Sequence, residues 1–452
     1  MKTRVLVPSG ALGLNYDDKA LKLGLKKNPD IIAIDGGSTD SGPSYLGKGI
    51  SKYSRIATKI EWKGLMEARE SAQIPLLIGT AGTCGTNSSV DWFLKITQEI
   101  AQELNQSLRI VIIRCSQDTE KVLDAYSTGK IQPLPNAPTL STEIITRCTN
   151  IVALAGIEQV IDALREKPDI IIAGRTTDTA IIAALPIMRG VDPGIAWHGA
   201  KIAECGALCT TNPLSGVIVV EFNDDSFSIE PMAQEANATP ETVSAHMLYE
   251  NTNPFILYEP GGYLDTTNAK YLAESDKKVK VFNSKWTVEE KYKVKIEGTV
   301  LTGYQNIIIT VLREKYYVSN ADKWVADVKL KCSKLVTERL GLNNEDFSIE
   351  LRLIGKNASF GDLETLRLDH FEIGVMALVT AKEQGITDEI SQMLNPLLLH
   401  NPLSSNEELP TFAFPFSPAD IRRGPIYEFC LHHTWELDEP LEIFNKEVVY
   451  LD

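Results

Sequence analysis

Two carboxylates stand close together in a segment that begins as an apolar run. Residues 31–49, IIAIDGGSTDSGPSYLGKG, pass from isoleucines to Asp35 and Asp40, with glycines and hydroxyl residues around them. A turn needs about one Gly and one Asp or Asn, so this segment carries more polar groups than a connection requires. A solvated loop is the alternative explanation, but the pattern favours one wall of a binding site. Asp35 and Asp40 would act there as general base or as ligands of a divalent metal such as magnesium.

Polar residues of similar kinds follow four other apolar runs. They are Ser9 after the first run, Gly79, Thr80 and Gly82 after the third, Arg114 after the fourth, and Arg175 and Asp178 after the fifth. Ser38 and Thr39 belong to the same set, from the segment after the second run. The carboxyl ends of parallel strands meet at one edge of a sheet, where ligands bind. We therefore expect these residues to line one pocket that binds a small anionic metabolite.

Two features of this edge suit a carboxylate or phosphate. Residues 79–89, GTAGTCGTNSS, join an apolar run to a helix and offer backbone N–H groups, without a P-loop or a GxGxxG fingerprint. Arg175 would hold a carboxylate with two parallel hydrogen bonds, and an ion pair with Asp35 or Asp40 is the equal alternative. Cys84 has no histidine nearby in sequence, so we interpret it as a packed thiol.

His198 and Glu204 are the candidates for a catalytic acid. They are six residues apart, and about 100° of rotation per residue places them off a common helix face. A fold can still bring either of them, or His246, to the pocket, although a partly buried structural role is the alternative for each. Cys205 and Cys209 have no second Cys or His pair in sequence, so no structural zinc set is expected.

The elements that position these residues follow from the alternation of apolar runs with amphipathic segments. The expected strands are residues 4–10, 30–37, 74–82, 108–115 and 169–176. This alternation predicts an α/β domain over residues 1–215, a doubly wound, mostly parallel sheet with helices on both faces. Irregularly spaced strands and helices predict an α+β domain over residues 216–452. A proline-rich segment near residues 402–425 is expected to be extended.

The composition limits the classes of partner. The 452 residues carry a net charge of -15, which argues against nucleic acid and anionic membranes as partners. No apolar run reaches the length of a membrane span, and the N-terminal run is too short for a signal peptide. The seven scattered cysteines without a Cys-x-x-Cys pattern indicate free thiols and a cytoplasmic location.

An ordered set of motifs resembles the acyclic terpene utilization (AtuA-type) family, from the first strand to about residue 433. The motifs are PSGALG, AIDGGSTDSGPSYLGKG, IGTAGTCG, AGRTTDTA, ECGALC, TPETVSAHMLYE, PGGYLD and FPFSPADIRRGPIYEF. The resemblance implies a place in the catabolism of acyclic terpenes, beside enzymes that break down acyl-CoA esters or small hydroxy acids.

The inventory of carboxylates, arginines and hydroxyls favours proton-transfer chemistry. We expect a lyase of the hydratase or dehydratase type that acts on a small hydroxy-carboxylate or a branched acyl-CoA. The alternative is a non-catalytic subunit that binds an acyl-CoA or a partner enzyme, and a hydrolase is the third option. We also expect a homo-oligomer, with a small companion subunit as a further option.

Overall fold

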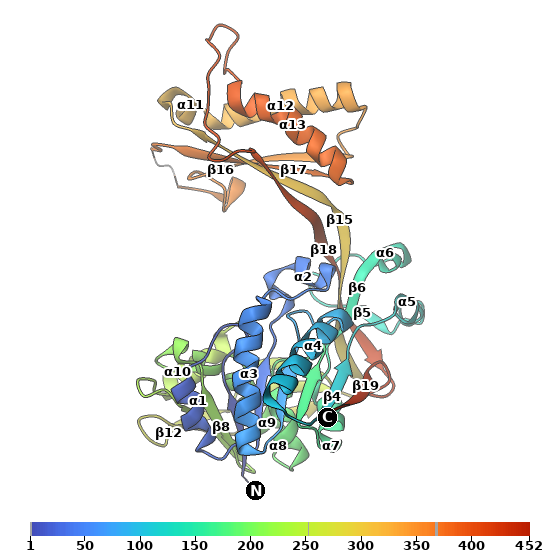
Figure 1. Cartoon of the computed structure of the whole chain (residues 1–452), viewed down its shortest axis with the longest axis vertical. Coiled ribbons are helices and arrows are strands. Elements are labelled where there is room, and N and C mark those ends of the chain that lie inside the picture. The colour runs from blue at the N-terminus through green and yellow to red at the C-terminus, as the bar shows by residue number, and fades with distance from the viewer. Residues whose placement is uncertain (1, 252, 367–368) are drawn as a thin grey trace. The chain divides into compact units, whose positions relative to one another are not determined.

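The computed structural model describes residues 2–251, 253–366 and 369–452. The chain forms two compact units, residues 1–300 with 429–452 and residues 301–428. The boundary falls within two long strands, β15 (Tyr292–Leu312) and β18 (Asp420–Leu437) (Figure 1). This division differs from the boundary predicted at residue 215, because strands after residue 216 extend the N-terminal sheet.

The first unit is built on a ten-stranded sheet whose centre is parallel. The central order is β1 (Thr3–Val7), β2 (Ile31–Asp35), β3 (Leu76–Gly79), β7 (Ile170–Ala173) and β4 (Leu108–Arg114). Antiparallel strands continue the sheet beyond β1, in the order β8 (Ile218–Phe222), β9 (Ser226–Pro231), β13 (Val279–Phe282) and β12 (Lys270–Ala273). On the other side, β19 (Asn445–Leu451) pairs antiparallel with β4. Each of the five predicted apolar runs is therefore a strand of the parallel core.

Helices cover both faces of this sheet, as predicted. One face carries α1 (Asp18–Leu25), α3 (Arg55–Ala72) and α4 (Asn87–Leu104), and the other carries α7 (Ile157–Arg165), α8 (Ala180–Met188) and α9 (Pro193–Ala203) (Figure 1). Successive strand residues serve opposite faces: Leu6 packs with Trp62 of α3, and Val5 packs in the core that contains Trp197 of α9. The predicted α/β class is confirmed.

The first unit contains several smaller elements besides this sheet and its helices. They are α2 (Pro43–Lys48), α5 (Thr119–Ser127), α6 (Thr142–Arg147), α10 (Pro240–Ala245), β5 (Ile131–Pro133), β6 (Cys148–Ala153) and the 3-10 turns η1 (Thr39–Ser41), η2 (Gly206–Cys209), η3 (Pro213–Ser215) and η4 (His246–Leu248). A three-stranded antiparallel sheet has the order β10 (Ile256–Glu259), β11 (Gly262–Asp265) and β14 (Lys285–Val288). Strands β5 and β6 pair with β18 and β15.

The second unit has the βαββαβ order of the ferredoxin-like arrangement. Its elements are the later part of β15, α11 (Lys315–Ser319), α12 (Ala321–Leu340), β16 (Phe347–Ile354), η5 (Gly361–Leu363), β17 (Ile373–Ala381), α13 (Gln384–His400) and the first part of β18. The strand order is β16-β17-β15-β18, and both long helices pack on one face around Trp324 and Phe412. Phe412 belongs to the proline-rich segment, which packs on this unit and contains no helix.

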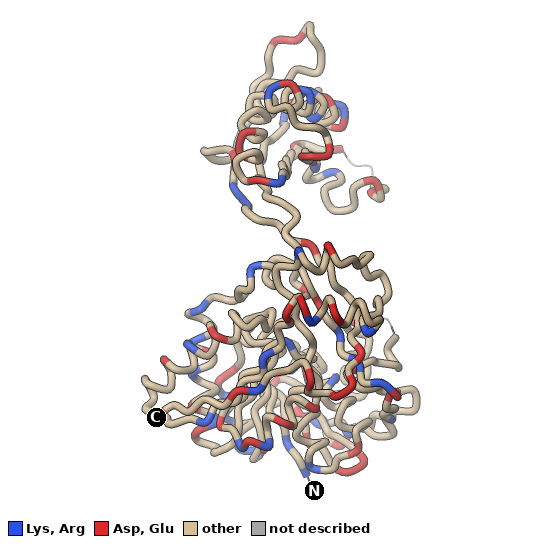
Figure 2. The backbone as a smooth tube through the Cα atoms, turned by 90° about the vertical axis from the view of Figure 1, so that its right-hand side faces the viewer, with Lys and Arg blue, Asp and Glu red and all other residues tan. Residues whose placement is uncertain are grey.

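The described part of the chain contains neither a basic stripe nor a helix that could span a membrane. Figure 2 shows Lys and Arg interspersed with Asp and Glu along the backbone. None of the helices in the described residues combines the length and the hydrophobicity needed to cross a bilayer.

Candidate active site at the carboxyl edge of the parallel sheet

The loops that follow β2, β3 and β7 are bonded to one another. Gly36 N donates to the Gly79 carbonyl at 2.8 Å, and Thr80 N donates to the Gly174 carbonyl at 2.9 Å. The contact is so close that a Cβ on Gly85, which has φ 63°, would lie 2.2 Å from the Arg175 nitrogen. The sheet edge predicted from the five strand ends therefore brings these loops together.

Arg175 sits at the centre of a group that we call the closed cluster: Thr39, Thr80, Arg175, Lys295 and Glu297. The Arg175 Nε donates to the Glu297 carboxylate at 3.1 Å, and its Nη atoms lie 3.4 Å from the hydroxyl oxygens of Thr39 and Thr80. Glu297 also accepts from Thr39 at 2.9 Å and pairs with Lys295 at 2.6 Å. The partner of Arg175 is thus Glu297, rather than Asp35, Asp40 or an open pocket.

The electrostatics of the closed cluster favour its charged form. Glu297 is buried, which disfavours its charge, but Arg175 and Lys295 together lower its pKa to about 2. Burial likewise works against the Arg175 charge, yet Glu297 raises the pKa of Arg175. Every polar atom of this ion pair is satisfied, so it holds η1 and β15 against the loops of the sheet.

The two carboxylates of the opening segment lie in different surroundings. Asp35 is buried, its Oδ2 accepts from Gly37 N at 2.9 Å, and its Oδ1 has no partner. Burial and the charge of Asp178 raise its pKa well above the ordinary value, against Arg175. Asp40 is exposed and accepts from Ser38 Oγ at 2.7 Å. Among the described residues these two carboxylates form no group of three metal ligands, and their proposed joint role stays a prediction.

A second group, which we call the open cluster, consists of Asp178, Lys201, Glu204 and Glu259. Lys201 and Glu204 form a buried ion pair across three residues at the end of α9. Glu259 ends β10 and accepts from Thr179 Oγ at 2.6 Å through its Oε1. The second carboxylate oxygens of both Glu204 and Glu259 are buried without a partner. This cluster therefore has free acceptors where the closed cluster has none.

Glu259 has the environment of a group that exchanges protons near neutrality. Its burial raises the pKa of the carboxyl to about 7, and the nearby charge of Asp178 acts in the same direction. The hydrogen bond from Thr179 and the charge of Lys201 oppose this shift. A buried carboxyl poised in this way is typical of a general acid or base.

Two cavities meet at Glu259. One has a volume of 210 Å³ and is lined by Asp178, Lys201, Glu204, Glu250, Asn251, Asn253 and residues 256–259. The other has a volume of 340 Å³ and is lined by apolar side chains, including Leu134 and Leu154, together with Lys293 and Lys295. Tyr258 and Glu259 line both cavities. The arrangement offers a charged compartment beside a partly apolar one, with a titratable carboxyl between them.

Several predicted site residues are bonded elsewhere. His198 lies fully buried in α9, where its ring nitrogens bond Ser284 at 2.6 Å and Tyr271 at 3.1 Å, and burial lowers its pKa to about 3. Arg114 forms ion pairs with Asp91 and Glu447 at the β19 side. The remaining predicted contacts are internal: Ser9 Oγ donates to the Ala11 carbonyl, and a Cβ on Gly82 would meet Ser89.

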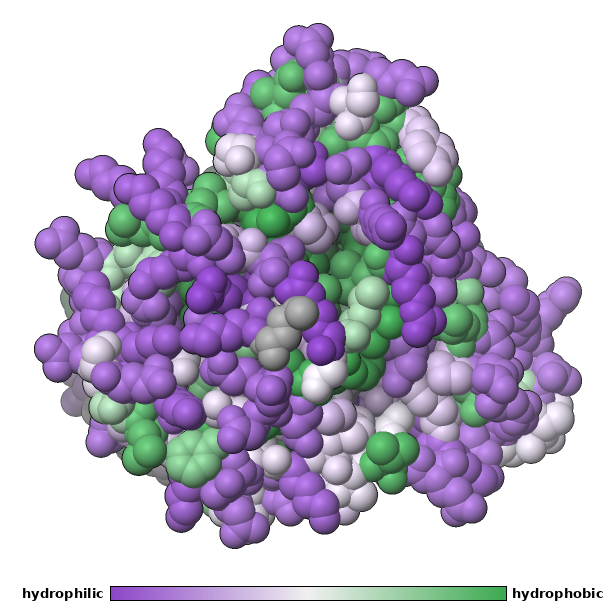
Figure 3. Space-filling view, turned by 90° about the horizontal axis from the view of Figure 1, so that it is seen from below, coloured by the Kyte–Doolittle hydropathy of each residue, from purple (hydrophilic) through white to green (hydrophobic). Residues whose placement is uncertain are grey.

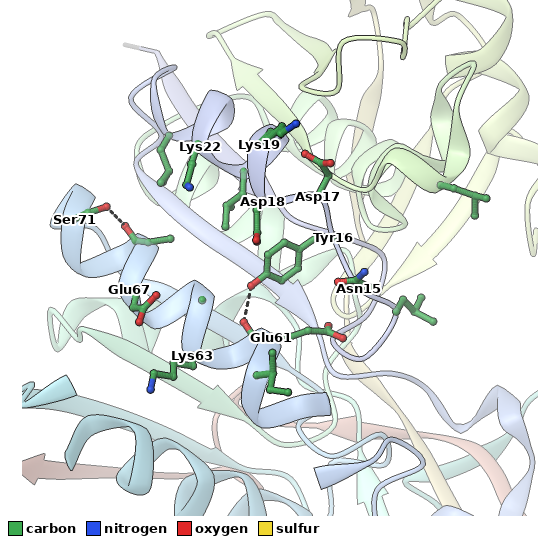
Figure 4. Close-up of a pocket in the computed structure, with 17 residues that line it drawn as sticks. Asn15, Tyr16, Asp17, Asp18, Lys19, Lys22, Glu61, Lys63, Glu67 and Ser71 are labelled. Atoms are coloured by element: carbon green, nitrogen blue, oxygen red, sulfur yellow. Dashed lines mark hydrogen bonds between the residues drawn. The ribbon is translucent and has the colours of Figure 1, made fainter. Parts of the chain in front are cut away.

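A larger groove lies between α1 and α3. Its volume is 1120 Å³, and Figure 4 shows Tyr16 pointing to α3, where its hydroxyl donates to the Glu61 carbonyl at 2.6 Å. Glu61 is buried and its carboxylate accepts from Gly13 N, whereas Asp18, Lys19 and Lys22 are exposed on the surface of α1. Their charges do not converge on buried atoms, so the groove lacks the chemistry that the edge near Glu259 has.

Sequence reasoning did not identify Lys201, Glu259 or Glu297. Lys201 and Glu204 have the i, i+3 spacing of a helical ion pair, which was an available signal. Glu259 stands before Pro-Gly-Gly at the end of a short strand, a position that marks a turn but not its partners. Glu297 is 122 residues from Arg175 and lies in a long strand, so no local pattern connects the two.

Comparisons with known proteins give one match. The family model described as "Acyclic terpene utilisation family protein AtuA" matches residues 77–403, which is most of the chain and includes Arg175, Lys201, Glu259 and Glu297. No curated protein and no solved structure is significantly similar to the chain.

Proposed function

The chain belongs to the acyclic terpene utilisation family AtuA, and we propose that it is a catabolic lyase of the hydratase or dehydratase type. Its substrate would be a small hydroxy-carboxylate or the branched acyl group of a CoA ester. The observation that carries the proposal is Glu259, a buried carboxyl with one unpartnered oxygen and a pKa of about 7, at the junction of two cavities.

The chemistry of water removal suits this arrangement. A base must take a proton from the carbon next to the carbonyl while the hydroxyl group leaves from the neighbouring carbon. Glu259 would take the proton through its free Oε2 and pass it to the departing hydroxyl, so that this group leaves as water and the carboxylate is restored. Lys201, which lines the same charged cavity, would donate hydrogen bonds to the leaving hydroxyl, and its ammonium would offset the negative charge that develops.

The cavity dimensions support a small reacting group. Ligand cavities in proteins commonly measure about 300–1,000 Å³, and the partly apolar cavity of 340 Å³ lies at the lower end. Leu134 and Leu154 would pack against a branched acyl chain, and Lys293 would face a carboxylate or thioester. Because Lys295 is already paired with Glu297, Lys293 is the lysine with the weaker competing contact, to Glu289 at 3.7 Å.

The competing function is a non-catalytic subunit that binds an acyl-CoA or a partner enzyme. Such a subunit is expected to present a broad apolar surface. On the face seen in Figure 3, hydrophilic residues predominate and hydrophobic ones show in smaller patches between them. The Glu259 carboxyl favours catalysis, because proton transfer needs a group whose pKa lies near neutral pH, whereas binding alone does not.

The deciding experiment measures water loss and water addition with hydroxy-dicarboxylates and branched acyl-CoA esters. Glu259→Gln keeps the shape of the side chain but removes the base, so turnover should fall by about 10²- to 10⁴-fold while the chain remains folded. Glu289→Gln is the matched control at the rim of the same cavity and should retain turnover. Substrate binding without turnover in the wild-type chain, or full turnover in Glu259→Gln, would sink the proposal.

The cellular setting is part of the proposal. All seven cysteines are free thiols, which supports a reducing compartment such as the cytoplasm. We propose that the chain acts there as a homo-oligomer on a small anionic metabolite. Sedimentation at several protein concentrations would test the oligomer, and a strictly monomeric chain would contradict it.

A further inference from the structure

We infer that Glu204, Cys205 and His246 form a binding site for one divalent transition-metal ion, with zinc as the best fit. Each residue offers one ligand atom, and the three atoms lie within 4.8 Å of one another. Carboxylate oxygen, thiolate sulfur and imidazole nitrogen are the ligands of protein zinc sites. The inference does not rest on the proposed function, because it concerns binding of the metal alone.

The fold brings these residues together from two segments. Glu204 and Cys205 directly follow α9, and the chain then turns at Gly206, which has φ 58° and where a Cβ would lie 3.0 Å from the Ser9 Cα. His246 begins η4, directly after α10, whose start is fixed by a capping box of Thr239 and Thr242. The third ligand is thus 41 residues beyond Cys205, so the sequence spacing contains no zinc motif.

A second observation points to a ligand at this place. Glu204 and His246 are 3% and 4% exposed, yet Glu204 Oε2 and His246 Nε2 have no hydrogen-bond partner. Buried polar atoms are nearly always bonded, and here two unbonded atoms of different ligand types occur in one cluster. A metal ion would bind both atoms and the Cys205 sulfur at once, whereas a hydrogen bond between the two atoms would leave the sulfur without a role.

Neighbouring contacts already fix the orientation of two ligands. Lys201 holds the other carboxylate oxygen of Glu204, so Oε2 is left for an ion. The His246 ring stacks on Tyr249, with centroids 5.6 Å apart and planes at 18°, which limits rotation of the imidazole. Such outer contacts are the usual means by which proteins position metal ligands.

The local charge favours a cation despite the presence of Lys201. The cavity beside Glu204 is lined by four carboxylates, Asp178, Glu204, Glu250 and Glu259, and by one ammonium, that of Lys201. A divalent ion would offset this excess of negative charge, and its attraction to several carboxylates outweighs its repulsion by one lysine. Sulfur as a ligand favours zinc over magnesium, which prefers oxygen ligands and an octahedral shell.

The number of ligands indicates the type of site. Tetrahedral zinc with bonds of about 2.0–2.3 Å places its ligand atoms about 3.3–3.8 Å apart. Side-chain rotations that move the ligand atoms by about 1 Å would therefore bring them to zinc-binding distances. Three protein ligands leave a fourth position for water, as in catalytic zinc sites. Since Glu204 also lines the cavity of 210 Å³, that position is open to a small molecule.

The experiment uses the full chain, freed of metal with a chelator and then dialysed against Zn²⁺ at increasing concentration. We expect one zinc per chain by elemental analysis, and at least a tenfold weaker affinity in Cys205→Ser and His246→Gln. Cys209→Ser, four residues away and outside the cluster, is the matched control and should bind as the wild type does. With Co²⁺ as probe, a near-ultraviolet sulfur-to-cobalt charge-transfer band should appear in the wild type and vanish in Cys205→Ser.

A second readout needs no variant. Zn²⁺ should protect the half-buried Cys205 from alkylation, measured on its peptide by mass spectrometry, while Cys148 reacts at an unchanged rate. Binding well below one zinc per chain, a cobalt spectrum without the sulfur band, or Cys205 labelling that ignores zinc would each overturn the inference. Glu259→Gln should keep the zinc affinity. Loss of turnover in that variant with zinc still bound would show that the zinc site and the proposed activity stand or fall independently.

Discussion

The closed cluster around Arg175 and the open cluster around Glu259 lie in the same unit, and both bury carboxylates among neighbouring loops. In the closed cluster the Glu297 carboxylate has three partners, and its pKa falls to about 2. In the open cluster Glu259 keeps a free oxygen, and its pKa rises to about 7. Burial acts in the same direction on both carboxyls, so the difference comes from their partners.

This contrast separates a structural use of buried charge from a chemical one. A carboxylate that is already bonded to buried protein cations is held in place, and breaking such a pair to free it for a ligand costs several kcal/mol. A carboxyl with an unbonded buried oxygen is destabilising by itself and gains a partner when a substrate or ion arrives. The predictions below perturb one cluster at a time.

The largest effect is expected from breaking the closed cluster. Glu297→Gln leaves the buried Arg175 without a counter-charge, so the free energy of unfolding should fall by about 3–5 kcal/mol in urea titrations at pH 7. Glu447→Gln, which breaks the partly exposed pair with Arg114, is the control and should cost less than about 1 kcal/mol. Equal losses of unfolding free energy in both variants would show that the buried pair of Arg175 and Glu297 stabilises the chain no more than the partly exposed pair does.

The next prediction is that Glu259 and Glu297 change the stability of the chain in opposite directions as the pH rises. The ordinary Glu value is 4.5, and folding raises the pKa of Glu259 to about 7 and lowers that of Glu297 to about 2. Glu259 therefore reduces stability as pH rises from about 4.5 to 7, and Glu297 adds stability that is lost as pH falls from about 4.5 to 2. Each window amounts to about 3.5 kcal/mol, from 2.5 pKa units at about 1.4 kcal/mol per unit.

The measurement is the difference between variant and wild type, because Asp178, Lys201 and Glu204 also face Glu259. Glu259→Gln should be more stable than the wild type above pH 7 and should lose this advantage below pH 5. Glu297→Gln should be less stable at pH 7 and approach the wild type near pH 2. The same sign of change in both variants would remove the distinction between the clusters.

A smaller shift is expected at the hydrogen bond that supports Glu259. Thr179 Oγ donates to Glu259 Oε1, which stabilises the carboxylate and lowers its pKa. Thr179→Val should therefore raise the acid limb of the pH profile of kcat/KM by about one unit, the equivalent of a hydrogen bond to a charged group. Thr210→Val removes a bond to a backbone carbonyl at the same edge and should leave the limb in place. A downward shift in Thr179→Val would contradict the assignment of Glu259 as base.

Whether the sequence could predict a contact in these clusters depends on how far apart the two residues are along the chain. The apolar runs and the polar residues that follow them are local, so the parallel strands and the shared edge with Asp35, Thr80 and Arg175 could be predicted. The 20-residue helix α12 also ends at a local signal, Gly341 in a left-handed conformation. The partner of Arg175 was not, because Glu297 arrives from a strand that pairs with β6 only in the folded chain.

The same reason explains the choice between candidate carboxylates. Asp35, Asp40, Glu204 and Glu259 are equivalent as sequence letters, and only burial and neighbours make them differ. Sequence spacing drew attention to Asp35 and Asp40 because they share one loop. The structure leaves Asp40 exposed and gives Asp35, Glu204 and Glu259 one buried, unbonded oxygen each, and Glu204 and Glu259 also line the cavity of 210 Å³.

The smallest effect is therefore expected at Asp40, a carboxylate that belongs to neither cluster. Asp40 is exposed and bonded to Ser38, so Asp40→Asn should change the free energy of unfolding by less than about 0.5 kcal/mol. Turnover should change by less than about threefold, because Asp40 lines neither of the two cavities that meet at Glu259. If Asp40→Asn instead loses 100-fold or more while Glu259→Gln stays active, the reaction belongs to the loop after β2. The closed cluster would then be the support of that loop in catalysis, and the open cluster would have to be explained by metal binding alone.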